Sequence, residues 1–214
     1  LITQGGNAEV GVVRAGAAGD QDVTIRAYGR LEMAEPTDVP SAKVRASQFT
    51  AVSYGEMNLV TAVDFFDGIK NTDLGSLSLL EDDAITLQQV QAEEGTIDIT
   101  SGGTLTAELV EVLTDIDQAS TSDITLRTTA GDILIDMVSA GLLHNDLFIT
   151  AEAGSIQEVN SEDGAADLIA DVATLTATAG IGSVFALETS FNELVADSTV
   201  SGNIDLNETD GILL

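Results

Sequence analysis

Apolar and polar residues alternate along the chain in short bursts of four to six positions. Clear bursts begin at Asp22, Gly95, Asp123, Asp146 and Gly202, and Val, Ile or Leu fills most of the alternate positions. A period of two is typical of β-strands, because successive side chains point to opposite faces. Gly or Asp opens each burst, and both residues suit tight turns. The pattern therefore predicts an all-β chain of short strands.

Two segments have a spacing that resembles a helix. Residues 165–170 (Ala-Ala-Asp-Leu-Ile-Ala) and 191–196 (Phe-Asn-Glu-Leu-Val-Ala) could each form one or two helical turns. Proline occurs only at Pro36 and Pro40, which bracket a predicted loop. The rest of the pattern leaves two all-β options, a sandwich or a solenoid.

An internal repeat favours the solenoid. Residues 75–87 (GSLSLLEDDAITL) align without a gap with residues 202–214 (GNIDLNETDGILL), and six of the thirteen positions are identical. Residues 22–27 match residues 146–151 in the same way, at an offset of 124. Self-similarity at a fixed period is the signature of repeat architectures. We expect the aligned segments to occupy the same place in successive periods.

The repeat divides the chain into three parts with a period of about 126 residues. Residues 1–87 form one copy, residues 88–125 form joining coils, and residues 126–214 form a partial second copy. Turn-and-strand units also return about every twenty residues, the length of one coil of a parallel β-helix. We therefore predict that residues 1–214 form one continuous β-solenoid of about ten coils, spaced about 4.8 Å apart.

Charge and composition limit the partners. The chain has 36 acidic and 7 basic residues and no cysteine, and residues 71–214 contain only Arg127 as a basic residue. Such a surface repels nucleic acids and anionic membranes, and it attracts divalent cations or basic partners. No apolar run is long enough to span a membrane, and we expect a signal peptide to be absent or already removed.

Several short motifs resemble a known group of proteins. They are Gly-Ile-Gly-Ser at 180–183, Gly-Asn-Ile-Asp-Leu at 202–206, Glu-Thr-Asp-Gly at 208–211 and Leu-Thr-Ala-Thr-Ala-Gly at 175–180. They are similar to repeats of very large bacterial surface proteins of the filamentous haemagglutinin-like type. The resemblance is closer in the second copy than in the first, and residues 30–75 depart most from it. It implies a right-handed parallel β-helix, secretion and a structural or adhesive role.

Paired carboxylates are the first candidates for chemistry, because glycoside-cleaving enzymes use two of them. The candidate groups are Glu81, Asp82 and Asp83, and Glu162, Asp163 and Asp167. With 36 acidic residues, close pairs also arise by chance, so a solvated acidic face is the simpler interpretation. Glu81 and Asp83 recur as Glu208 and Asp210, which fits a role in a turn.

Other candidates are weaker. A Ca²⁺ site needs six to eight oxygen ligands, and Asp115 and Asp117 supply too few, so Ca²⁺ stays an alternative and no cofactor is predicted. His144 is the only histidine and the chain has no cysteine, so a zinc site is poorly supported. We expect His144 to be a surface turn residue and not the general base of a nucleophilic enzyme. Tyr28 and Tyr54 are the only tyrosines and do not cluster in the sequence, which counts against a sugar-binding platform.

The sequence thus predicts a structural, non-catalytic module of an extracellular bacterial fibre or surface adhesin, with no catalytic, cofactor-binding or metal residues. Residues 1–3 and 211–214 have the pattern of uncapped strands. We expect copies of the chain, or further repeats of the same chain, to stack end to end on them, with divalent cations as additional partners. The alternative is a carbohydrate-binding or carbohydrate-cleaving parallel β-helix.

Overall fold

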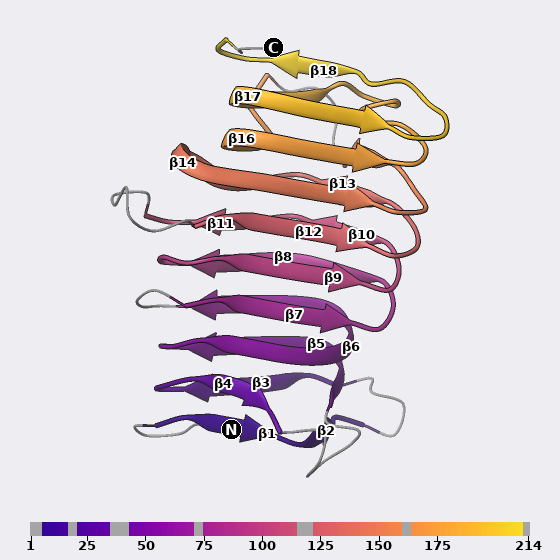
Figure 1. Cartoon of the computed structure of the whole chain (residues 1–214). Helices are drawn as coiled ribbons and strands as arrows, with labels where there is room; N and C mark the ends of the chain where they lie inside the picture. The colour runs from indigo at the N-terminus through magenta and orange to yellow at the C-terminus, as the bar shows by residue number, and fades with distance from the viewer. Residues whose placement is uncertain are drawn as a thin grey trace.

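The computed structural model describes residues 6–16, 21–34, 43–70, 75–114, 122–159 and 164–211. The regular secondary structure of these residues consists of β-strands alone, and all ladders between the strands are parallel. The strands wind into a β-solenoid of about eight turns, which runs from the N-terminal to the C-terminal strands as a rod (Figure 1). The predicted fold class is confirmed. These residues contain no helix that is long and apolar enough to cross a membrane.

The described residues form eighteen strands. In chain order they are β1 (Ala8–Val10), β2 (Val12–Arg14), β3 (Val23–Ala27), β4 (Leu31–Met33), β5 (Lys43–Ser53), β6 (Met57–Lys70), β7 (Leu77–Glu81), β8 (Ile85–Ala92), β9 (Ile97–Ser101), β10 (Leu105–Ala107), β11 (Val110–Val112), β12 (Ile124–Thr128), β13 (Ile133–Ile135), β14 (Val138–Ala151), β15 (Ile156–Glu158), β16 (Leu168–Ala177), β17 (Leu187–Ser198) and β18 (Leu206–Glu208).

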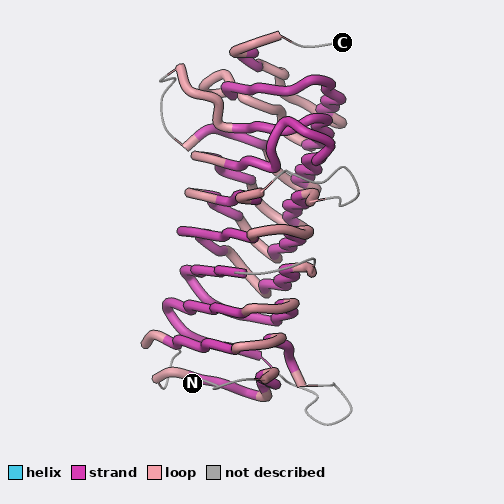
Figure 2. Tube along the Cα trace, turned by 90° about the vertical axis from the view of Figure 1, so that its left-hand side faces the viewer, coloured by secondary structure: helices cyan, strands magenta, loops and turns pink. Residues whose placement is uncertain are grey.

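The turn that begins at Leu77 shows the three sides of the solenoid. The strand β7 forms the first side, the start of β8 forms the second, and the end of β8 forms the third. The chain then returns to the first side in β9, which pairs with β7 so that Leu77 lies against Ile97. In the same way β10 pairs with the start of β8 and β11 with its end. Figure 2 shows these turns stacked along the rod.

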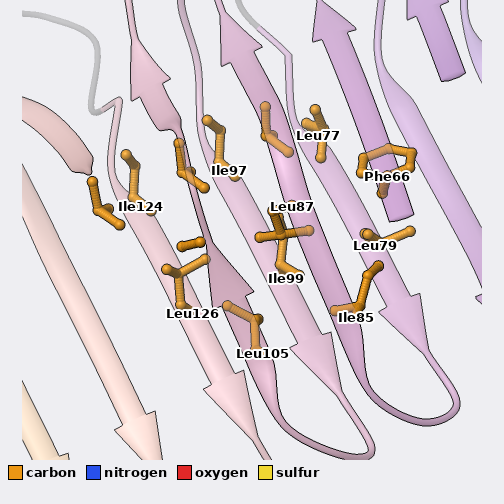
Figure 3. Close-up of a cluster of buried hydrophobic side chains, with 14 of the residues drawn as sticks. Phe66, Leu77, Leu79, Ile85, Leu87, Ile97, Ile99, Leu105, Ile124 and Leu126 are labelled. Carbon is orange, nitrogen blue, oxygen red and sulfur yellow. The ribbon is translucent and has the colours of Figure 1, made fainter. Parts of the chain in front are cut away.

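Inward-pointing residues of successive turns form continuous apolar columns. On the first side Leu77, Ile97, Ile124 and Leu147 follow one another, and all four are 0% exposed. On the second side the equivalent column contains Ile85, Leu105, Ile133 and Ile156. Figure 3 shows part of both columns, with Leu77, Ile97 and Ile124 from the first side and Ile85 and Leu105 from the second. Full burial of an aliphatic side chain contributes about 1.5–3 kcal/mol, so such columns are a major source of the stability of the fold.

The length of a turn varies more than the sequence suggests. Along the first-side column, Leu77 and Ile97 are 20 residues apart, whereas Ile97 and Ile124 are 27 apart. The strands keep their register while the connections between them change in length. The longer connections explain why the chain makes about eight turns instead of the ten expected from a uniform spacing of twenty.

The two segments with helical spacing do not form helices. Residues 168–170 begin β16, and residues 191–196 lie within β17. There Phe191 pairs with Ala170, and Ala196 pairs with Leu175. Pairing with the preceding turn satisfies the backbone N–H and C=O groups, so the tertiary context overrides the local pattern.

The sequence repeat is out of phase with the turns. Leu77 lies on the first side, whereas its equivalent Ile204 belongs to the second-side column. Residues 6–16 of the first copy match residues 131–141 of the second at an offset of 125. Ala8 lies on the first side, and its equivalent Ile133 lies on the second. Five turns lead from Ala8 to Ile124 on the first side, and Ile133 follows one side later. The expectation that aligned segments occupy the same place is therefore wrong.

Candidate functional site

Glu81 lies at the corner between the first and second sides, at the end of β7. Its side chain is buried, with the residue only 1% exposed. Its Oε2 atom accepts hydrogen bonds from the Thr61 hydroxyl at 2.7 Å and the Val63 N–H at 3.2 Å, both in the preceding turn. Its Oε1 atom accepts the N–H groups of Asp82 at 2.9 Å and Asp83 at 3.3 Å. One carboxyl group thus holds two consecutive corners of the solenoid together.

This position belongs to a polar column that runs up the corner. Thr61, Glu81, Ser101 and Thr128 stack in register and are all buried. The Ser101 hydroxyl donates to the Asp83 carbonyl at 2.5 Å, and the Thr128 hydroxyl donates to the carbonyl of a turn glycine at 3.1 Å. Side chains at the end of the first side therefore replace backbone hydrogen bonds that the bend interrupts.

Burial sets the protonation of this corner. It raises the pKa of the Glu81 carboxyl to about 7, and the neighbouring Asp83 side chain adds to the rise against the lowering effect of the Thr61 hydroxyl. Burial also raises the pKa of Glu208, with a hydrogen bond to Asp210 adding to it. The same hydrogen bond lowers the pKa of Asp210. In each copy of the repeat, Glu and the Asp two residues later thus share a hydrogen bond as a carboxyl pair.

The second copy repeats the contacts of the first on another side of the solenoid. Glu208 accepts the Thr189 hydroxyl at 2.9 Å and the Phe191 N–H at 3.2 Å. These donors are a threonine in the preceding turn and the residue two positions after it, as Thr61 and Val63 are for Glu81. The turn role predicted for this motif is what the hydrogen bonds show.

A shallow pocket of about 250 Å³ lies next to the corner of Glu81. It is lined by Asp64, Phe65, Ala84, Ile85, Thr86, Thr104 and Thr106. Hydrolysis by two carboxylates needs a second acid about 5–9.5 Å from the first. The lining contains one carboxyl group, that of Asp64. The pocket offers hydroxyl groups and one aromatic ring, which suit weak polar contacts more than acid–base chemistry.

A second group of carboxylates is buried between the second and third sides. Carboxylate oxygens of Glu158, Asp167 and Glu188 all lie within 4.8 Å of one another. Glu158 continues an inward column that holds Leu87 and Ile135 in earlier turns. Three oxygen donors at this spacing could hold a hard divalent cation such as Ca²⁺. Asp167 is the only residue of its predicted trio within the described part of the chain, and the structure places it here.

Hydrogen bonds fix two members of this group. Both Glu188 oxygens accept the Gly164 N–H, at 2.9 and 3.0 Å, and the Glu188 N–H donates to Asp167 Oδ2 at 3.1 Å. The candidates predicted from the sequence included neither Glu158 nor Glu188. Glu158 is a charged residue at an inward position of β15, and this can be recognised only when the register of that strand is known.

Acidic residues of consecutive turns, among them Asp123, Asp146 and Asp171, lie close together at the corner that precedes the first side. Burial raises the pKa of Asp146, and the nearby charges of Asp123 and Asp171 raise it further. The Asp146 N–H donates to Asp123 Oδ1 at 2.9 Å, one turn away. These groups concentrate negative charge on one edge of the rod, which attracts counterions without a defined coordination sphere.

The two tyrosines come together, against expectation. Tyr28 follows β3, and Tyr54 follows β5 in the next turn. Their ring centroids are 5.3 Å apart and the planes differ by 6°. The residues are 54% and 43% exposed. Twenty-six sequence positions separate them, so only the register of the solenoid reveals the pair.

His144 sits in β14, where the register with β16 shifts. It has a positive φ of 65° and is exposed, so its predicted place on the surface is confirmed, whereas the residue belongs to a strand and not to a turn. Asp82 is exposed at its corner and forms an ion pair with Lys43. Glu162, Asp163, Asp115 and Asp117 lie outside the described residues, as do residues 1–3 and 212–214.

A scan against protein-family models, a search of curated proteins and a search of solved structures each gave no match.

Proposed function

We propose that this chain is a structural, non-catalytic segment of an extracellular bacterial fibre or large surface adhesin. In this proposal the solenoid is a rigid rod, and further turns stack on its ends. They belong either to more repeats of the same polypeptide or to another copy. The filamentous haemagglutinin-like resemblance of the sequence motifs agrees with such a role.

The observation that carries the proposal is the end of the second-side column. Ile133, Ile156 and Ile181 stack in register and are 0% exposed, whereas Ile204, the next residue of the column, is 44% exposed. Among the described strands β18 pairs with β17 alone. An open edge with an exposed inward aliphatic residue is a template for another strand. A stacked turn would bury Ile204 and pair this edge.

Charge supports a contact along the axis. Six of the seven basic residues lie in residues 1–70, and residues 71–214 have a net charge of −26, from 27 acidic residues and Arg127. Residues 1–70 also contain nine acidic residues, so their net charge is −3, and the negative charge of the rod is concentrated in the rest of the chain. A contact between the nearly neutral N-terminal end and the strongly negative C-terminal end is less repulsive than a contact between two C-terminal ends, and such heterologous contacts extend instead of closing.

Electron microscopy and light scattering of the native protein test this proposal. We expect rods about 40 Å long or end-to-end multiples of them, since about eight turns are spaced about 4.8 Å apart. Ile204→Asp should reduce end-to-end growth, and Leu80→Asp, on an outer face that is 50% exposed, should leave it unchanged. Compact particles, or equal growth of both variants, would contradict the proposal.

A carbohydrate-binding or carbohydrate-cleaving solenoid is the second candidate, and the Tyr28–Tyr54 stack favours its binding form. Partly exposed aromatic rings can pack against the apolar faces of sugars, and Arg30 lies two residues from Tyr28. Calorimetric titration with soluble polysaccharides tests it. Binding that is lost in Tyr54→Ala would support this function, and heat signals equal to buffer dilution would exclude it for those sugars.

A further inference from the structure

The Tyr28–Tyr54 stack results from the same short motif in consecutive turns. Each tyrosine lies between a strand and a glycine, in Ala-Tyr-Gly at 27–29 and Ser-Tyr-Gly at 53–55. The Tyr54 N–H donates to the Ala27 carbonyl at 3.2 Å, and the Gly55 N–H donates to the Gly29 carbonyl at 3.1 Å. The backbone ladder therefore continues through both tyrosines. It holds the two rings parallel, with centroids 5.3 Å apart.

The pair is accessible, and the chain contains few competing groups. The two residues are 54% and 43% exposed, so a diffusing oxidant reaches both rings. The chain has no cysteine and no tryptophan, and these are its only two tyrosines. A one-electron oxidant thus meets no thiol, indole or other phenol on this protein. The two phenols directly follow matching positions of paired parallel strands, and with ring centroids 5.3 Å apart they are neighbours in the folded chain.

We propose that Tyr28 and Tyr54 form a site of oxidative cross-linking, at which a peroxide and a haem peroxidase join the two rings as dityrosine. Each phenol loses one electron and its hydroxyl proton to become a phenoxyl radical. The radicals couple through ring carbons next to the hydroxyl groups, and the hydrogen on each of these carbons moves to the phenol oxygen. Two phenols and one hydrogen peroxide give one dityrosine and two waters.

The product would link consecutive turns covalently. The bond would close a loop between residues 28 and 54, close to the N-terminal end of the described solenoid. A cysteine-free chain can form no disulfide, so this bond would give the rod a cross-link of another kind. The inference rests on the ring geometry and not on the proposed fibre role, and it stands or falls separately from that role.

The test uses the full chain with hydrogen peroxide and a haem peroxidase. We expect a monomer that has lost two hydrogen atoms and has gained dityrosine fluorescence. Trypsin cleaves after Lys and Arg, so the bond should join the tryptic peptides 27–30 and 46–70. Its yield should not change on dilution, because the reaction is intramolecular. In urea, where the rings are no longer held together, its initial rate should fall about tenfold or more.

Tyr28→Phe is the matched control, because it keeps an aromatic ring in the stack and removes one phenol. It should form no intramolecular product, and neither should Tyr54→Phe. Circular dichroism of both variants checks that the fold is kept. The proposal is overturned if dityrosine appears only in cross-linked dimers whose yield rises with concentration. It is also overturned if the native and urea-unfolded chains form the intramolecular bond at the same rate.

Discussion

The buried carboxyl group of Glu81 makes the stability of this solenoid dependent on pH. Its pKa is about 7 in the folded chain and 4.5 in the reference state. Between these values the folded chain holds a proton that the unfolded chain has released. The free energy of unfolding should therefore fall as the pH rises from about 4.5 to about 7, and it should level off above that range.

The size of the effect follows from the two pKa values. Each unit of difference corresponds to about 1.4 kcal/mol, so a rise from 4.5 to about 7 gives about 3 kcal/mol. The residue is only 1% exposed, so solvent does little to screen it. Glu81→Gln has no charge to lose and should lack this dependence. Relative to the natural chain, the variant should gain about 3 kcal/mol between pH 4.5 and pH 8.

Urea unfolding at a series of pH values and constant ionic strength measures this difference. Asp98→Asn is the control, since it removes one acidic group from the exposed outer face of β9. The control accounts for the general effect of the high negative charge. If the difference between Glu81→Gln and the natural chain varies by less than about 0.5 kcal/mol over this range, the carboxyl is not the source of the dependence.

Three further predictions concern the interior and the turns of the rod. Leu126→Ala removes a fully buried column residue and should lower the unfolding free energy by about 2–5 kcal/mol in urea titrations, whereas Thr125→Ala on the outer face should change it by less than about 0.5 kcal/mol. Gly95→Ala should lower the unfolding free energy more than Gly164→Ala in the same titrations. Both glycines have a positive φ, so both substitutions strain the backbone. A Cβ at Gly95 would also lie 2.0 Å from a backbone oxygen, whereas one at Gly164 would meet nothing within 4 Å. Glu158→Leu removes one of three adjacent buried carboxylates, so with a chelator present it should raise the unfolding free energy by about 1–4 kcal/mol. A loss of stability in this variant would contradict the prediction and show that the carboxylate group stabilises the fold.

Much of the architecture was predictable from local patterns. The alternation at residues 97–101 and 124–128 identified strands, and the turn-and-strand spacing identified a solenoid, because strand period and turn chemistry act over few residues. The number of turns was not predictable in the same way. Connections such as the one between Ile97 and Ile124 lengthen a turn without changing the strands.

The candidate sites were harder to predict, because they join residues from different turns. Tyr28 and Tyr54 stack only because Ala27 and Ser53 are paired in the ladder. The group at Glu158 depends on which residues of β15 point inward. The role of Glu81 was partly visible, since its recurrence indicated a turn, but its burial and the bond from Thr61 required the register between β6 and β7.

The phase of the repeat explains what the recurring motif encodes. Glu81 and Glu208 make matching bonds to a threonine and to a backbone N–H of the preceding turn, although Leu77 and Ile204 lie on different sides of the solenoid. The motif therefore specifies a strand and the corner after it, and the preceding turn supplies the register. Sides of one solenoid can exchange such units because each presents the same ladder to the next. Equivalent outer positions of the repeat, such as Ser78 and Asp205, therefore lie on different sides of the rod in the two copies. Any ligand surface on this rod must be sought along the structural columns and not along the sequence alignment.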